Sequence, residues 1–509
     1  MDLDTLLSFE WSIMAPEFTI LIVATILSIA DLFMSKKVDR RPFGWIAIAG
    51  IIVALAFLVG QLDHGFTEIL FDTYRLDGFS KAFKLILLVG TLIVFLLAIP
   101  YEKEGKLSVY RGEFYYLLLT ALLGAMMMAS SADIITLFVG LELLTISSYI
   151  LAGLKKNSLK SNEAAMKYVV MGGISTAITL FGLSYIYGLT GSTKLVTIAQ
   201  QLQTISADSQ SHALVALAFI ITFVGLAFKI SSAPFHMWAP DVYEGAPTPV
   251  TAFLSVVSKA AGFTLIIRLF VTIFTTTPGL EMNTSIIQSL MIFISVLAGI
   301  TMIIGNTVAL RQRNIKRLFA YSSIAHAGYL LVPLVGFTAL TPMIFESTWF
   351  YLVAYLFMNL GAFTVIQLMI EKSKSEDLTI FSGLFYRSPL LAIVMTVFLV
   401  SLAGIPGTAG FIGKLNIFLG ALYGAEPHYV LAGVMMATTV ISYFYYFGIM
   451  TQMFSRPASS YSKIKIPAPL LIAMIICAAG TLVLGIFPDL AFSIFGDLNA
   501  AEVLMGVLG

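Results

Sequence analysis

The sequence predicts an all-α polytopic membrane protein with about fourteen transmembrane helices, two inverted five-helix repeats and two broken helices. Three observations support this fold class: a composition poor in charge, long apolar segments along the whole chain, and prolines in the middle of two of those segments. The alternation of apolar and polar residues that a membrane β-barrel requires is not the pattern here.

Composition makes lipid the solvent for most of the chain. Hydrophobic residues occupy 59% of the 509 positions and charged residues only 11%, whereas a soluble domain carries about 25% charged residues. The net charge of +1 gives no indication of nucleic-acid binding. Cys477 is the only cysteine, so an internal disulfide and an iron–sulfur cluster are excluded, and we expect it to be a small buried residue.

Each transmembrane helix needs about 20 mainly apolar residues. The stretches that meet this requirement lie near 16–34, 43–60, 80–99, 114–130, 132–153, 163–189, 213–237, 247–272, 286–310, 314–337, 343–370, 388–424, 429–454 and 467–489. The N-terminal MDLDTLLSFE lacks the basic region of a cleaved signal peptide, so we expect the first span to be retained. No soluble domain fits between the spans.

The distribution of basic residues among the loops predicts how the chain is oriented across the membrane. Loops after odd-numbered spans hold 20 of the 29 Lys and Arg residues, whereas the even-numbered loops and both termini hold only Arg75, Lys81 and Lys194. Cytoplasmic loops are enriched in positive residues. We therefore expect the odd-numbered loops in the cytoplasm and both termini outside.

Six basic residues remain inside apolar stretches: Lys84, Lys167, Lys229, Lys259, Arg268 and Lys414. Lys84 and Arg268 lie near span ends, which predicts interfacial anchoring. Lys167 follows Glu163 by one helical turn and can pair with it.

Three charged residues lie near the membrane midplane. At about 1.5 Å per residue, Glu142 is roughly 15 Å into its span, and Lys229 and Lys259 are roughly 12 and 18 Å from their cytoplasmic ends. A charge at this depth costs about 2.5–3.5 kcal/mol. Burial favours a neutral amine and a nearby carboxylate favours the ammonium form, so such lysines can carry protons. The alternative is a permanent Glu142–Lys229 ion pair that joins two helices.

His326 lies in the middle of a span, in YSSIAHAGYLL. A histidine changes its charge near neutral pH, which suits a proton relay, and Ser322 and Ser323 can assist. The alternative is a core histidine with satisfied hydrogen bonds. No second histidine follows at the spacing of a metal site.

Two spans carry proline inside the apolar run. Pro234 follows Lys229 by five residues, and Pro406 precedes Lys414 by eight. Interior proline breaks a helix, and unwound backbone at membrane depth must be buried in protein or line a wet cavity. The glycine run before Lys414 is not a P-loop, because Thr408 replaces a required glycine.

The breaks fall five spans apart, which predicts two inverted repeats. The expected units are an N-terminal segment at 1–113, a first repeat at 114–272, a second repeat at 286–454 and a C-terminal span and tail at 455–509.

Several strings carry a family resemblance: PDVYEGAPTPVTAFLSVVSKAAGF, GLELLTISSYILAGL, EAAMKYVVMGG, RLFAYSSIAHAGYLL and AGIPGTAGFIGKL. Over essentially all the spans, the chain resembles the subunit N family of the proton-pumping NADH–quinone oxidoreductase, respiratory complex I. Members of this family are antiporter-like membrane subunits.

The resemblance implies a proton-transfer chain. Glu142 and Lys229 would form the coupled pair of the first half-channel, Lys259 would be the central relay, and Lys167 would support them.

The same resemblance makes His326 the continuation of the chain and Lys414 its terminal residue. In this chain Gly407 replaces the second proline of the family's GIPPTAGF. We expect the break to survive on Pro406 and the neighbouring glycines.

The resemblance also implies the setting: a bacterial plasma membrane, where the chain would move protons while other subunits reduce quinone. Its partners would be the lipid bilayer and the other membrane and peripheral subunits of complex I, including neighbouring antiporter-like subunits. No cofactor or metal is expected on this chain, whereas the whole complex would use NAD and quinone.

Two other functions are compatible with buried lysines and broken helices. The chain could exchange Na⁺ or K⁺ for protons as an antiporter or antiporter subunit, although the PDVYEGAPTPV string argues against this. It could also be a structural anchor that conducts nothing.

Overall fold

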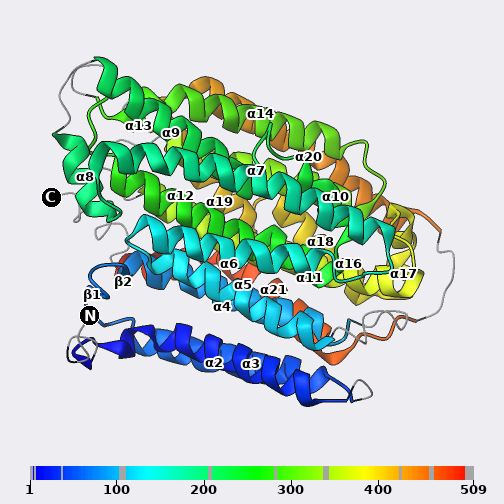
Figure 1. Ribbon diagram of the computed structural model, residues 1–509. Coiled ribbons are helices and arrows are strands. Elements are labelled where there is room, and N and C mark those ends of the chain that lie inside the picture. Colours follow the sequence, from blue (N-terminus) through cyan, green and yellow to red (C-terminus); the bar gives the residue numbers. More distant parts are fainter. Residues whose placement is uncertain are drawn as a thin grey trace.

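Long apolar helices make up most of the computed structural model and lie side by side with roughly aligned axes (Figure 1). The structure describes residues 4, 7–35, 38–101, 111–204, 209–279, 284–335, 343–423, 427–457 and 463–498. Lys36, Lys37, most of the expected cytoplasmic loop after the third span, and the tail beyond residue 498 lie outside the described residues.

In the described part of the chain, thirteen helices are long and apolar enough to cross a membrane. Twelve are α2 (Ala15–Phe33, extended by the short η1, Trp11–Met14), α3 (Arg41–Gly60), α4 (Gly78–Ala98), α5 (Arg111–Ser130), α6 (Ile134–Ala152), α7 (Leu159–Thr190), α9 (Ser209–Lys229), α14 (Met291–Ala309), α15 (Ile315–Val335), α16 (Met343–Ser373), α20 (Tyr429–Ser455) and α21 (Ala468–Ile486). The other is a continuous rod of α11 (Thr248–Phe253), the π-helical η2 (Leu254–Ser258) and α12 (Lys259–Phe274). The predicted all-α polytopic membrane fold is confirmed.

The remaining predicted span is divided into two shorter apolar helices, α18 (Pro389–Ala403) and α19 (Ala409–Leu422). The short elements are β1 (Thr67–Ile69), β2 (Tyr74–Leu76), α8 (Leu195–Gln203), α10 (Trp238–Gly245), α13 (Ile286–Ser289), η3 (Leu378–Phe381), α17 (Leu384–Arg387) and α22 (Asp489–Asp497). The antiparallel hairpin, with Thr67 opposite Leu76, and α8 lie at one end of the bundle, and α17 lies at the other (Figure 1).

Local chemistry starts the helices where the structure has them. The Asp77 side chain accepts from the Ser80 backbone N–H, and the Ser80 hydroxyl accepts from the Asp77 N–H, which forms a capping box for α4. Asp133 is a simple N-cap of α6, and its side chain accepts from the backbone N–H groups of Ile135 and Thr136. Both aspartates therefore satisfy helix ends that would otherwise have unpaired donors.

Three elements form the buried centre: the α11–η2–α12 rod, α15 and α16. Every residue of the rod is buried, and so is almost all of α15. A helix that is apolar and buried all round contacts protein on every side. Lys259 begins α12 and His326 lies in the middle of α15, so both are placed at the centre of the protein.

Both predicted helix breaks are present, with one difference in position. The seventh span was predicted to continue to residue 237, but α9 ends at Lys229, and Pro234 lies in the turn that leads to α10. The second break leaves Gly404 and Gly407 with φ angles of +85° and +88°. These left-handed conformations favour glycine, and the fixed φ of proline excludes it from such a position.

The predicted interfacial anchoring of Lys84 and Arg268 is wrong. The Lys84 Nζ lies 2.6 Å from the Glu17 Oε1, and their side chains are 0% and 3% exposed. Arg268 donates to both carboxylate oxygens of Asp77, again in a buried pair. Their partners lie on other elements far away in sequence, so position within a span did not indicate burial. These pairs join α2 to α4 and α12 to the start of α4.

We expect Lys84→Met to destabilise the protein by about 3–5 kcal/mol, because it leaves the Glu17 carboxylate buried without a counter-charge. The double variant Glu17→Gln/Lys84→Met should recover most of that loss. Thermal unfolding of the purified protein measures both. Lys463→Met, at an exposed position, is the control, and an equal effect in Lys84→Met and the control would contradict the prediction.

Candidate functional site

Lys229 is the last residue of α9 and is held between two neighbouring helices. Its Nζ donates to the Thr145 hydroxyl of α6 at 2.9 Å. Its stem lies against Gly262 of α12, where an added Cβ would stand 3.3 Å from the Lys229 Cγ. The ammonium group is therefore buried with a neutral hydroxyl partner, close to the helix that carries Lys259.

Glu142 lies one helical turn before Thr145 on α6, and its Oε1 accepts from the Thr176 hydroxyl of α7 at 2.9 Å. Within the described residues, no ion pair closer than 4.0 Å joins Glu142 to Lys229. The permanent ion pair that was the alternative interpretation is therefore not the observed arrangement. Instead, α6 presents Glu142 and the partner of Lys229 on successive turns.

Lys259 follows the π-helical segment directly and is 2% exposed. Such π-bulges are frequent at functional sites. The Lys259 Nζ donates to both the backbone carbonyl and the hydroxyl of Ser323 on α15. Its other close neighbour is the ring of Tyr355 on α16, with 6.0 Å between the Nζ and the ring centroid.

His326 lies one turn after Ser323 on α15, is buried, and is contacted by several tyrosines. Its Nδ1 lies 2.6 Å from the Tyr351 hydroxyl, and its Nε2 lies 3.2 Å from the Tyr446 hydroxyl. The Tyr446 hydroxyl also lies 2.5 Å from the Ser322 hydroxyl. Both ring nitrogens thus have a hydroxyl partner, and a neutral imidazole donates through one and accepts through the other.

The tyrosines around His326 were missed from the sequence. One signal was available, because Tyr351 and Tyr355 stand four residues apart and so share a face of α16. An aromatic pair at that spacing in an apolar span is usually core packing, and nothing local identifies the histidine that it contacts.

Lys414 lies on α19 and reaches back across the second break. Its Nζ donates to the backbone carbonyls of Leu402 and Ala403 at 2.9 and 3.0 Å. These residues end α18, where carbonyl groups have no partner within their own helix. The break therefore supplies the acceptors for the buried ammonium group. Tyr329 adds its ring, 5.0 Å from the same Nζ.

Lys167 belongs to a different environment from the other lysines. Its side chain is 41% exposed, and its Nζ lies 2.6 Å from both the Glu163 Oε1 and the Asp241 Oδ2. The predicted pairing with Glu163 is present. Arg317 contacts Asp241 and Glu244 and extends this surface network.

Burial alone would raise the pKa of Asp241, but the hydrogen bonds from Lys167 and Arg317 outweigh it and hold the pKa below its ordinary value. The structure therefore groups Lys167 with surface charges rather than with the buried lysines.

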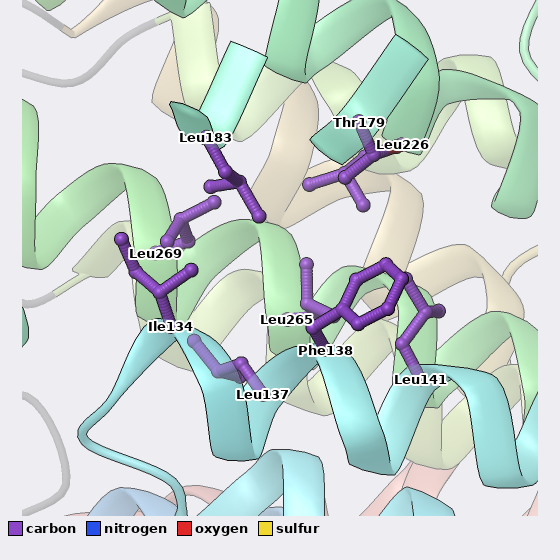
Figure 2. Close-up of a pocket in the computed structure, with 9 residues that line it drawn as sticks. All are labelled: Ile134, Leu137, Phe138, Leu141, Thr179, Leu183, Leu226, Leu265 and Leu269. Atoms are coloured by element: carbon purple, nitrogen blue, oxygen red, sulfur yellow. The ribbon is translucent and has the colours of Figure 1, made fainter. Parts of the chain in front are cut away.

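No group of three or more His, Cys, Asp or Glu side chains that could hold a metal occurs in the described part of the chain. A pocket between α6, α7, α9 and α12 is shown in Figure 2, lined by Ile134, Leu137, Phe138, Leu141, Thr179, Leu183, Leu226, Leu265 and Leu269. Thr179 is its only polar side chain, and its hydroxyl already donates to the Ser175 carbonyl. This lining suits apolar groups.

Comparisons with known proteins agree on one family. The family model described as "NADH:quinone oxidoreductase/Mrp antiporter, TM" matches residues 131–442. A curated relative, NADH-quinone oxidoreductase subunit N of Geobacillus sp. (strain WCH70), is 59% identical over 97% of this chain and 99% of its own length.

Solved structures show the same fold. A chain of respiratory complex I from Thermus thermophilus with bound Aureothin is 29% identical, with a TM-score of 0.77 over 94% of this chain and 98% of that chain. A chain of the Mrp complex from Dietzia sp. DQ12-45-1b is 20% identical and has a TM-score of 0.81 over 98% of this chain and 99% of that chain, a likeness of fold alone.

We expect Gly404→Ala to displace Lys414, because a Cβ at this position would stand 2.8 Å from the Lys414 Cδ. The left-handed backbone adds about 1–2 kcal/mol of strain for alanine, so the free energy of unfolding should fall by at least that amount. Gly433→Ala is the control, since a Cβ there meets nothing within 4 Å. A Gly404→Ala protein as stable as this control would show that the close approach is not required.

Proposed function

The chain belongs to the family of NADH-quinone oxidoreductase subunit N, the antiporter-like membrane-arm subunits of respiratory complex I, and we propose that its buried lysines carry the protons. The complex couples proton translocation to quinone reduction. On this chain the path would run from Glu142 and Lys229 through Lys259 and His326 to Lys414.

One observation carries this proposal: the three lysines of the proposed path, Lys229, Lys259 and Lys414, donate hydrogen bonds to neutral oxygen atoms instead of carboxylates. Lys229 has a hydroxyl, Lys259 a hydroxyl and a carbonyl, and Lys414 two carbonyls. A buried ammonium ion without a counter-charge is expensive, and a neutral amine avoids that cost. Each lysine can therefore exist as an ammonium ion or as a neutral amine, as a proton relay requires.

The order of the path is supported by shared helices. The Lys229 stem contacts α12, the helix that Lys259 begins. Ser323, the partner of Lys259, lies one turn from His326. Tyr351, which contacts His326, also packs against Gly413, the residue before Lys414. Lys167, bound to surface carboxylates, would act at the entrance rather than inside.

The wider arrangement of the chain belongs to the same proposal. The four proposed units, 1–113, 114–272, 286–454 and 455–509, would put one broken helix in each inverted repeat. The distribution of basic loops favours both termini outside a bacterial plasma membrane. NAD and quinone would be bound by other subunits of the complex.

The main alternative is exchange of Na⁺ or K⁺ for protons. The family description that includes Mrp antiporters is compatible with it, whereas the 59% identity to a subunit N favours complex I. Purification of the chain from its native membrane discriminates, because quinone-reducing partner subunits should accompany it. A purely structural anchor would instead predict that Glu142→Gln and Lys259→Met change stability but leave proton flux unaltered.

Lys229→Ala in the assembled complex should lower proton translocation per electron, because the first half of the path loses its only buried amine. Proton uptake and NADH oxidation in membrane vesicles measure the ratio. The exposed Lys463→Ala is the matched control. Normal assembly together with an unchanged ratio in Lys229→Ala would rule out the role of this lysine.

A further inference from the structure

The hydrogen bonds around the centre of the site leave one gap. Lys259 is bonded to Ser323, and His326 is bonded to Tyr351 and Tyr446. Among the described residues, no hydrogen bond links the first group to the second. A proton that leaves Lys259 needs another carrier at this point.

Tyr355 stands in that gap. Its ring centroid is 6.0 Å from the Lys259 Nζ and 4.9 Å from the centroid of the His326 ring. The side chain is 1% exposed. No hydrogen bond of normal geometry reaches its hydroxyl within the described residues, although Ser323 lies near it. An unpaired buried hydroxyl costs about 1–3 kcal/mol, so native structures usually satisfy such a group with an ordered water.

A second unpaired atom lies one turn further along the same face of α16. The side-chain amide of Asn359 donates to the Ser255 hydroxyl at 2.9 Å, while the Asn359 Oδ1 has no hydrogen-bond partner in the described part of the chain. Ser255 lies in the π-helical segment that ends at Lys259. Tyr355 and Asn359 therefore both contact the rod that carries the central lysine, and each has one unsatisfied polar atom.

We propose that Tyr355 and Asn359 hold a structural water beside Lys259, and that this water links Lys259 to the hydroxyls around His326. The inference rests on the proposed proton path and supplies its missing step. The Lys259 ammonium group gives a proton to the water, and the water gives one to a tyrosine hydroxyl that bonds the imidazole. That hydroxyl passes its own proton to the ring, which leaves a neutral Lys259, a protonated His326, and an unchanged water and tyrosine. Tyr355 acts as a positioning residue, since its hydroxyl fixes the water without keeping the proton.

The test is Tyr355→Phe in the assembled complex, which keeps the ring and removes the hydroxyl. NADH oxidation coupled to proton translocation should fall by about tenfold, the effect of losing one well-placed hydrogen bond on a rate. Tyr115→Phe is the matched control, because Tyr115 is equally buried on α5 against Phe95. It should leave the coupled rate unchanged.

A third variant, Lys259→Met, tests the water link and the proton path separately. If Lys259→Met lowers the coupled rate while Tyr355→Phe behaves like Tyr115→Phe, the water link is wrong and the proton path stands. If Lys259→Met also has no effect, the proton path itself is wrong.

A direct readout does not depend on any variant folding. A high-resolution structure of the unaltered complex should show an ordered water within about 3 Å of the Tyr355 hydroxyl. An unoccupied position there would overturn the proposal, even if Tyr355→Phe failed to assemble.

Discussion

A charged amine in a hydrocarbon environment must reach oxygen atoms, and this constraint governs where the helices of the protein cross and where they break. Lys229 reaches the Thr145 hydroxyl on a neighbouring helix, and Lys259 reaches Ser323. Lys414 uses a different source, because the break after α18 exposes two backbone carbonyls. The second broken helix therefore supplies the carbonyl groups that solvate the Lys414 ammonium group.

The buried basic residues that the sequence placed inside the apolar stretches fall into two classes that differ in their partners. Lys84 and Arg268 are matched directly by the carboxylates of Glu17 and Asp77. A close buried pair holds both charges in place, since loss of either leaves the other uncompensated. The lysines of the site have only neutral partners, which tolerate either protonation state. Burial alone does not distinguish the two classes, but the chemistry of the partner does.

This distinction explains how far the sequence could predict the site. The depth of Lys229 and Lys259 and the positions of the two breaks follow from hydrophobic length and proline chemistry, which are local properties. The pairing of Arg268 with Asp77 is not local, because the two residues are 191 positions apart.

The tyrosines around His326 were hidden for the same reason. Tyr446 comes from a helix 120 residues away in sequence, and its spacing on that helix indicates only packing. The surface position of Lys167 depends on Asp241, which lies 74 residues further along the chain.

Glycine explains how two of these lysines come close enough to their acceptors. The stem of Lys229 crosses α12 at Gly262, and that of Lys414 crosses the end of α18 at Gly404. A methyl group at Gly404 would overlap the lysine chain, and its left-handed backbone already excludes most side chains. Gly407 takes a similar backbone angle where the family pattern has proline. A proline at position 407 could not adopt that angle. The carbonyl groups that bind Lys414 come from α18, the helix before the turn.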